Sequence, residues 1–274
     1  MKKTKTYKNL KIYMTKSKVK YIYKEKNFID YLEEKKITFY KQDGYYDDVP
    51  NTHPQATVWD MPYYKELNDI VITFLGNIKS KIILDLGSGI GIDTQFLLEA
   101  GANVVSLDSS EKSLKTSLKH NNNIHIRADA SKIPFKKEVF DIVFGRNILH
   151  HLNEKKCLKE VRRVLKRNGT SVFIEPLKYN PAIAIYRLIN RKERVPQHPF
   201  SPDQLKKISY KLFRKQEEKF LYTLFPFFYF FMIYTPKLDN LFSQLYCNNI
   251  AKLDKKITNF LPYFSWIQVI KFYK

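Results

Sequence analysis

The stretch "ILDLGSGIGID", residues 83–93, decides the fold. Large aliphatic residues around Asp85 lead into Gly87, Gly89 and Gly91 at alternate positions. An apolar run that ends in glycines indicates a buried strand that passes through a tight turn into a helix. Glycines there let the backbone approach a ligand, and the next helix offers its free N–H groups. The stretch therefore predicts a nucleotide-type site at the carboxyl end of a strand.

Strand-like and helix-like segments alternate on the carboxyl side of this stretch. The predicted strands are 81–86, 102–108, 123–129, 139–145 and 170–176, and the predicted helices between them are 91–101, 109–120 and 153–169. We expect Asn153 to cap the last of these helices and Gly169 to end it. This alternation is typical of a parallel sheet with helices on both faces.

After Pro176 the alternation loosens. A helix is predicted to start with Ser201 as its N-cap and Pro202 at its first helical position. The next segment, 220–236, has 17 residues without a charge, and nine of the first fifteen are aromatic. We interpret it as a core strand that continues into a buried helix; the alternative is an apolar acceptor pocket or a surface that dips into lipid, with the basic arm on anionic headgroups. Further helical sequence follows, and residues 265–274 read as a final strand.

These patterns divide the chain into five parts. The parts are a basic arm (1–26), an N-terminal cap with the first helix (27–78), a ligand-binding core (79–177), a substrate-side insertion and cap that includes a late core helix at 201–213 (178–262), and the final strand (263–274). The arm carries ten lysines and a single acid, Glu25, with little periodicity, so we expect it to be mobile or loosely docked.

The glycine spacing separates two kinds of nucleotide ligand. Dinucleotide folds favour GxGxxG, whereas this chain has GxGxG and places Ile92 where the third glycine would stand. A dehydrogenase is therefore disfavoured. Asp108 ends the second strand, 21 residues after Gly87, where a carboxylate can accept from both ribose hydroxyls. Asp129 ends the third strand and could accept from an exocyclic adenine amine, with the N–H of Ala130 near the ring; an ordinary turn is the alternative for Asp129.

Five motifs in order carry a family resemblance: "LDLGSGIGI", "SLDSS", "RADASKIPF", "FDIVFGRNILHHL" and "LKEVRRVLKRNGTSVFIEP". They resemble the class I S-adenosylmethionine-dependent methyltransferases, in the branch that acts on quinone precursors, sugars and lipids. The resemblance implies a Rossmann-like α/β fold with seven strands, the last antiparallel, and a helical, aromatic cap before that strand. It implies S-adenosylmethionine as cofactor, with Asp85 near its amino group. The expected cofactor-binding residues are Asp85, Gly87, Ser88, Gly89, Gly91, Asp108, Ser109, Asp129, Ala130 and Asn147. No metal is expected.

Histidines after the fourth strand are candidates for a general base. Asn147, His150 and His151 lie on the rim of the expected cleft, and Glu175 ends the neighbouring strand. A His–Glu pair across two strand ends would suit a base and the carboxylate that orients it. We favour His151 as the base. The alternatives are that the histidines pack or cap the following helix and that Glu175 anchors the substrate loop.

The bulk composition constrains the partners only loosely. The formal charge is +21, which fits a polyanion partner or a biased composition rich in Lys, Asn, Ile, Phe and Tyr. The cysteines, Cys157 and Cys247, lack the spacing of a zinc site or disulfide framework and fit a reducing compartment. We see no signal peptide and expect a cytoplasmic protein, with peripheral contact to an anionic membrane as an option.

We therefore expect a methyltransferase that acts on an O, N or C atom of a small or lipid-like acceptor. One alternative is an RNA or protein methyltransferase that uses the positive charge. We find no RNA-binding module, and "GRNI" stands where many amino-methylating nucleic-acid enzymes have "NPPY". Another alternative is a non-enzymatic subunit with the same fold, which the intact glycines and aspartates disfavour. The acceptor and the oligomeric state stay open.

Overall fold

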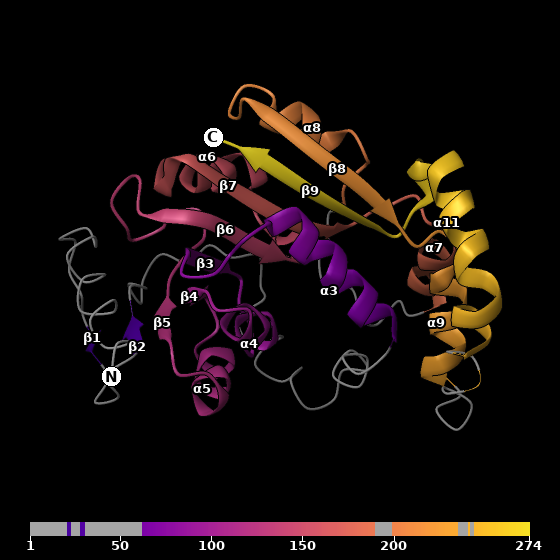
Figure 1. The fold of residues 1–274 in the computed structure, drawn as a ribbon, viewed down its shortest axis with the longest axis horizontal. Coiled ribbons are helices and arrows are strands. Elements are labelled where there is room, and N and C mark those ends of the chain that lie inside the picture. The colour runs from indigo at the N-terminus through magenta and orange to yellow at the C-terminus, as the bar shows by residue number, and fades with distance from the viewer. Residues whose placement is uncertain (1–20, 23–27, 31–61, 190–198, 235–240, 242–243) are drawn as a thin grey trace.

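The computed structural model describes residues 21–22, 28–30, 62–189, 199–234, 241 and 244–274. One mixed sheet runs through it in the order β1-β2-β5-β4-β3-β6-β7-β9-β8 (Figure 1). Its strands are β1 Tyr21–Ile22, β2 Phe28–Asp30, β3 Ile82–Leu86, β4 Asn103–Asp108, β5 Ile124–Arg127, β6 Phe140–Arg146, β7 Leu165–Pro176, β8 Lys215–Leu221 and β9 Ile267–Tyr273. The expected α/β architecture is confirmed.

The order of strands β3 to β9 explains where the site lies. Strands β3 to β7 run parallel, and β9 pairs antiparallel with both β7 and β8. The glycine stretch follows the central strand β3, where the order reverses between β4 and β6. A crevice at the carboxyl ends of the strands forms at such a switch point. The antiparallel last strand that the resemblance implied is therefore present.

Two short strands extend the sheet beyond the seven expected. β2 pairs parallel with β5, and β1 pairs antiparallel with β2. The predicted seven strands are confirmed as β5-β4-β3-β6-β7-β9-β8, and β1 and β2 add two short strands at one edge of the sheet. Strands of two and three residues are too short to show a period in the sequence. The rest of the arm, and most of the N-terminal cap before Pro62, lie outside the described residues.

Alternate side chains of the buried strands enter two apolar layers. Ile83, Val104 and Val172 face one layer, and their neighbours Leu84, Val105 and Phe173 face the other, as strand geometry requires. The first layer packs against α3 (Pro62–Leu75) and α4 (Ile92–Glu99). The second packs against α6 (Glu154–Val164) and α8 (Gln204–Ser209). The sheet is therefore covered on both faces, as expected.

Two predicted helix boundaries were wrong. Asn153 does cap α6, because its side chain accepts from the N–H of Lys156, but the helix ends at Val164 rather than Gly169. Leu165 is already extended and pairs with Phe140, so the residues up to Gly169 belong to β7. The late helix α8 begins at Gln204, and its N-cap is Asp203. The carbonyl of Ser201 accepts from the N–H of Gln204, which closes a turn before the helix.

The segment before the last strand forms a helical cap. Strand β8 leads into α9 (Phe225–Tyr234), so the predicted passage from strand to helix is present, but only Phe220 and Leu221 of the aromatic run belong to the strand, and β8 is an edge strand of the sheet rather than a core strand. Figure 1 shows α9 beside α7 (Pro181–Ile189) and α11 (Ala251–Phe260), next to the carboxyl end of β7. The short helical segments Tyr246–Ile250 and Pro262–Phe264 flank α11. The cap therefore stands at the same edge of the sheet as the glycine stretch.

A buried carboxylate holds the cap together. Asp254, on α11, accepts from the backbone N–H groups of Thr223, Leu224 and Phe225 at 2.8–3.0 Å and from the hydroxyl of Tyr246 at 2.6 Å. The N–H groups at the start of a helix have no partner within the helix and carry partial positive charge. Asp254 therefore caps α9 from a different helix, and it fixes α9 and α11 relative to each other.

Candidate active site

The glycine turn has a backbone that other residues cannot adopt without strain. Gly87, Gly89 and Gly91 all have positive φ angles, of 72°, 52° and 88°. A Cβ at Gly87 would lie 2.7 Å from the side chain of Ile148, and one at Gly91 would overlap Ser117 and Asn121. The predicted tight turn is confirmed, and two of its glycines are also required by close packing.

Gly89 differs from the other two because it faces open space. No atom lies within 4 Å of the position that its Cβ would occupy. Its N–H donates to Oδ2 of Asp108 at 2.8 Å, and Oδ1 of Asp108 accepts from the N–H of Ser110. Nearby, the buried hydroxyl of Ser88 has no hydrogen-bond partner among the described residues. The turn therefore presents an open backbone, an unsatisfied hydroxyl and a carboxylate in one place.

Asp85 lies beneath this turn in a buried polar chain. Its Oδ2 accepts from Oγ1 of Thr94 at 2.5 Å, and Thr94 also contacts the hydroxyl of Ser106 at 2.9 Å. The side chain of Asn123 donates to the same Ser106 hydroxyl. Burial, with the nearby charge of Asp93, raises the pKa of Asp85 to about 8, against the opposing hydrogen bond from Thr94. Asp85 is therefore mostly protonated at neutral pH.

An ion pair that the sequence did not reveal joins three elements at the site. Nη2 of Arg146, at the end of β6, lies 2.9 Å from Oδ1 of Asp93 on α4, and both side chains are largely buried. The same nitrogen donates to Oδ1 of Asn68 on α3 at 3.0 Å. Asp93 stands inside the opening stretch and Arg146 inside "GRNI". A buried cation needs a partner. An arginine at the end of an apolar strand was therefore the sequence signal from which this ion pair could have been predicted.

The remaining predicted cofactor residues lie along the same edge. Asp129 follows the end of β5 by two residues rather than ending the strand, and its carboxylate accepts from both the N–H and the hydroxyl of Ser131. Ala130 is buried beside it, Ser109 is exposed, and Asn147 is exposed with a positive φ of 54°. The N–H of Ala128 donates to the carbonyl of Asp108, so the ends of β4 and β5 adjoin.

The histidine pair divides into one buried and one half-buried ring. Nδ1 of His150 lies 2.6 Å from Oε2 of Glu175, which is fully buried. Glu175 also accepts from the N–H groups of Ile148 and Leu149, so it caps the short 3₁₀ helix Leu149–His151. The ring of His151 packs on that of His150, with centroids 3.9 Å apart. The structure thus brings a His–Glu pair together across β6 and β7, with His150 as the histidine.

His151 is electrostatically unlike a free histidine. Burial, followed by the neighbouring His150, lowers the pKa of His151 to about 3. The ring is therefore neutral at ordinary pH. A neutral imidazole has one nitrogen that can accept a proton or a hydrogen bond.

The strand order and the glycine turn define a class of fold, the Rossmann-like α/β fold that solved methyltransferase structures share. Residues 84–173 match the family described as "Methyltransferase domain". The chain therefore carries a methyltransferase domain over its central residues. The matched part contains the turn, Asp108, Asp129 and the histidine pair.

Curated relatives and solved structures agree with this domain. The chain is 32% identical over 133 residues to a demethylmenaquinone methyltransferase of Renibacterium salmoninarum (47% of this chain, 56% of the relative). It is 27% identical over 120 residues to a ubiquinone biosynthesis O-methyltransferase of Bordetella avium (42% and 50%). The chain thus spans about half the length of these relatives. The fold is similar to that of Haemonchus contortus phosphoethanolamine N-methyltransferase 2 in complex with S-adenosyl-L-methionine, with TM-score 0.55 and 17% identity over 84% of this chain and 60% of that chain.

Proposed function

We propose that this protein transfers a methyl group from S-adenosylmethionine to a small or lipid-like acceptor. The observation that carries the proposal is the contact between Asp108 and the N–H of Gly89. It places a carboxylate against an open glycine turn inside a methyltransferase domain. The quinone-directed names of both curated relatives support a small, apolar acceptor class.

The residues present fit the proposed cofactor. The carboxylate of Asp108 would accept from ribose hydroxyls, since each carboxylate oxygen can accept more than one hydrogen bond. The open side of Gly89 and the unsatisfied hydroxyl of Ser88 suit close contact with a polar ligand. Asp129 and Ala130 would lie by the adenine, and Asp85 by the amino group. When bound, S-adenosylmethionine supplies a sulfonium methyl group that a nucleophile can displace without a metal.

The histidine pair then has two separate tasks. The pair of His150 and Glu175 is buried and fixes the 3₁₀ helix, so we assign it a positioning role. His151 is half-buried and neutral, so it is the better candidate to accept a hydrogen bond or proton from an O–H or N–H acceptor. Alignment of the acceptor with the methyl group would also accelerate the transfer.

The helical cap would supply both the acceptor pocket and a membrane contact. Large exposed apolar side chains gather on α7, on α11 and just after it: Ile185, Leu188, Leu253, Phe260, Leu261, Tyr263 and Phe264. Lys252, Lys255 and Lys256 are exposed on the same α11. An apolar surface beside lysines suits shallow contact with an anionic bilayer. Within the described residues no helix has the length and apolar character needed to cross a bilayer.

The membrane contact can be tested with a matched pair of variants. Flotation with vesicles that contain phosphatidylserine should recover the wild type and lose Phe260→Ser. Tyr210→Ser is the control, because Tyr210 is 79% exposed, close to the 83% of Phe260, but lies after α8 and outside the cap helices. Equal recovery of both variants, or equal binding to neutral and anionic vesicles, would overturn the contact.

The activity is tested by transfer of a radiolabelled methyl group from S-adenosylmethionine to a cell extract, followed by fractionation. We expect the label in the lipid or small-molecule fraction, and its loss with Asp108→Ala. Label in RNA or protein would instead support the alternative acceptors. If calorimetry detected no binding of S-adenosylmethionine, the result would favour the alternative of a non-enzymatic subunit with a methyltransferase fold.

A further inference from the structure

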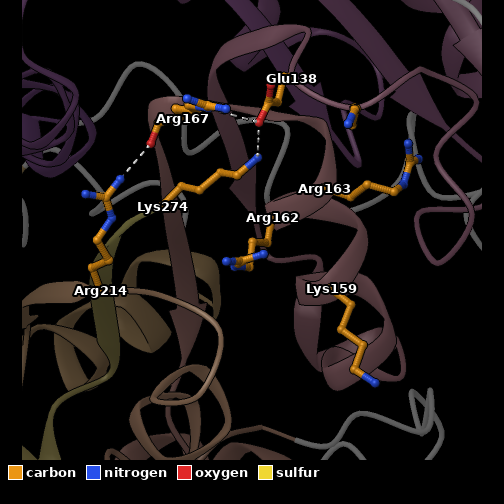
Figure 2. A pocket seen from close by; sticks show the side chains of 8 residues that line it. Glu138, Lys159, Arg162, Arg163, Arg167, Arg214 and Lys274 are labelled. Carbon is orange, nitrogen blue, oxygen red and sulfur yellow. Dashed lines mark hydrogen bonds and ion pairs between the residues drawn. The ribbon is translucent and has the colours of Figure 1, made fainter.

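A basic hollow of about 450 Å³ lies at the end of the sheet where the parallel strands begin, opposite the end that carries the glycine turn. It forms where β6, β7 and β8 begin and where the antiparallel β9 ends. Its lining side chains are Lys137, Glu138, Lys159, Arg162, Arg163, Arg167, Arg214 and Lys274, and Figure 2 shows them arising from several elements. Nothing in the proposed methyl transfer uses this edge.

Positive charges outnumber negative charges among the described residues that line this hollow. Seven of the eight lining side chains are cationic, and the single carboxylate, Glu138, lies 3.7 Å from Lys274 and 4.0 Å from Arg167. Arg163 also has an acidic partner, Glu160 at 2.7 Å. Burial and the nearby Arg162 and Arg167 lower the pKa of Lys274 against the opposing effect of Glu138. Like charges are therefore crowded together here, and a bound anion would relieve their repulsion.

Backbone contacts hold several of these cations in place. Nε of Arg162 donates to the carbonyl of Leu212 at 2.5 Å, and Nη2 of Arg214 donates to that of Arg167 at 3.1 Å. Nζ of Lys274 donates to the carbonyl of Leu165. In Figure 2 the side chain of Lys274 extends toward Glu138, between Arg167 and Arg162. A guanidinium has five N–H donors in a fixed fork, so these bonds position the groups and leave donors for a ligand.

We propose that this hollow binds a soluble ligand that carries two or more adjacent phosphate groups. Arginine forks match phosphate oxygens in pairs, and the volume lies in the range of small-molecule sites, about 300–1,000 Å³. The hollow is concave and none of its lining residues is apolar, which disfavours a lipid surface. None is aromatic either, whereas grooves for single-stranded nucleic acid stack bases on aromatic rings.

The test measures binding of sodium tripolyphosphate to the full chain by isothermal titration calorimetry at low ionic strength, with S-adenosylhomocysteine present to fill the cofactor site. The test variant combines Lys137→Ala, Lys159→Ala and Arg167→Ala, which remove three exposed charges from the hollow. The matched control combines Lys252→Ala, Lys255→Ala and Lys256→Ala, which remove three charges from exposed positions on α11. Circular dichroism and S-adenosylhomocysteine affinity confirm that both variants are folded.

We expect the test variant to bind tripolyphosphate at least about tenfold more weakly than the wild type, and the control to stay within about twofold. Added salt should weaken the wild-type binding because it screens the charges. An equal loss of tripolyphosphate affinity in both variants would mean that only the net charge of the protein matters, and it would overturn the site. Binding of polyuridine or anionic vesicles through the same three residues, without binding of tripolyphosphate, would overturn the ligand class.

Discussion

Nδ1 of His150, in the 3₁₀ helix that follows β6, lies 2.6 Å from Oε2 of Glu175 near the end of β7, and both side chains are buried. The same carboxylate accepts from the N–H groups of Ile148 and Leu149. One side chain of β7 therefore fixes the backbone that follows β6. That backbone carries Asn147 and His151, and the side chain of Ile148 also packs against Gly87. The arrangement connects the base candidates to the cofactor turn.

Replacement of Glu175 should affect the rate more than cofactor binding. Glu175→Gln keeps the shape of the side chain but loses the charge-assisted bonds, so we expect a loss of about 1.5–3 kcal/mol in the free energy of unfolding. The displaced loop should lower kcat while the Kd of S-adenosylhomocysteine changes little. Urea denaturation and calorimetry measure these two effects. A large rise in the Kd with an unchanged kcat would show that Glu175 serves the cofactor instead.

His151 can be separated from its buried neighbour by turnover. If the acceptor is an O–H or N–H group, His151→Ala should lower kcat by about 10²-fold or more. His120→Ala, at an exposed position on α5 (Glu111–His120), should leave kcat unchanged. The pKa of His151 is lowered to about 3, so His151 should cause no inflection near pH 6.5 in the pH dependence of kcat. The residual kcat of His151→Ala should therefore have the same pH dependence around pH 6.5 as that of the wild type. Near wild-type turnover of His151→Ala would remove it as the base.

Two glycines of the turn should respond differently to the same substitution. Gly89→Ala meets open space, so its cost is the left-handed backbone, about 1–2 kcal/mol, and its main effect should be weaker cofactor binding. Gly91→Ala has the same backbone cost and also displaces Ser117 and Asn121, which adds about 1–3 kcal/mol. Thermal denaturation and calorimetry with S-adenosylhomocysteine compare the two. An equal loss of stability would contradict the difference in packing.

The core was predictable because local signals there agree with the global fold. Short apolar runs separated by capped helices specified the parallel strands, and the glycine spacing with Asp108 specified the edge that holds the site. The start and register of the long strand β7 could not be predicted from the local sequence. The segment from Leu165 to Gly169 has the composition of a helix end, yet pairing of Leu165 with Phe140 makes it part of β7.

Long-range polar contacts were also invisible in the sequence. Asp254 reads as one charge on an amphipathic helix, and only the fold brings it to N–H groups 29 to 31 residues earlier in the chain. The pair of Asp93 and Arg146 likewise joins α4 to β6. The histidine that meets Glu175 could not be chosen from two adjacent candidates, because the turn of the 3₁₀ helix decides which ring points inward.

Asp254 offers a test of the cap as a separate unit. Asp254→Ala leaves three N–H groups and the hydroxyl of Tyr246 without their acceptor, so we expect a loss of about 3 kcal/mol or more in the stability of the cap. Hydrogen exchange should rise across α9 and α11 while β3 to β6 stay protected. Thr116→Ala, on α5 and distant in sequence, is the control. If exchange rose equally in the central strands, the cap would not be a separate cooperative unit.

The pKa of Asp85 leads to a prediction about proton release. In the free protein the pKa is raised to about 8, so at pH 7 the carboxyl group is mostly protonated. A cofactor amino group placed beside it would favour the charged form, and binding should release up to about 0.9 proton at pH 7. Calorimetry with S-adenosylhomocysteine in phosphate and in Tris, which differ in ionisation enthalpy, measures this release. Asp85→Asn should abolish it, and an unchanged release in that variant would assign the proton to another group.

The same pKa fixes the sign of a stability effect. A carboxyl whose folded pKa is raised from 3.8 to about 8 binds more protons in the folded state than in the unfolded state between these values. Its contribution to stability is therefore complete below pH 3.8 and is lost as the pH rises toward 8. The ligand-free wild type should lose more stability between pH 5 and pH 8 than Asp85→Asn, as measured by urea denaturation at both values. An equal loss in the two proteins would mean that Asp85 is already ionised at pH 5 in the free protein and that Arg146 and Thr94 outweigh its burial.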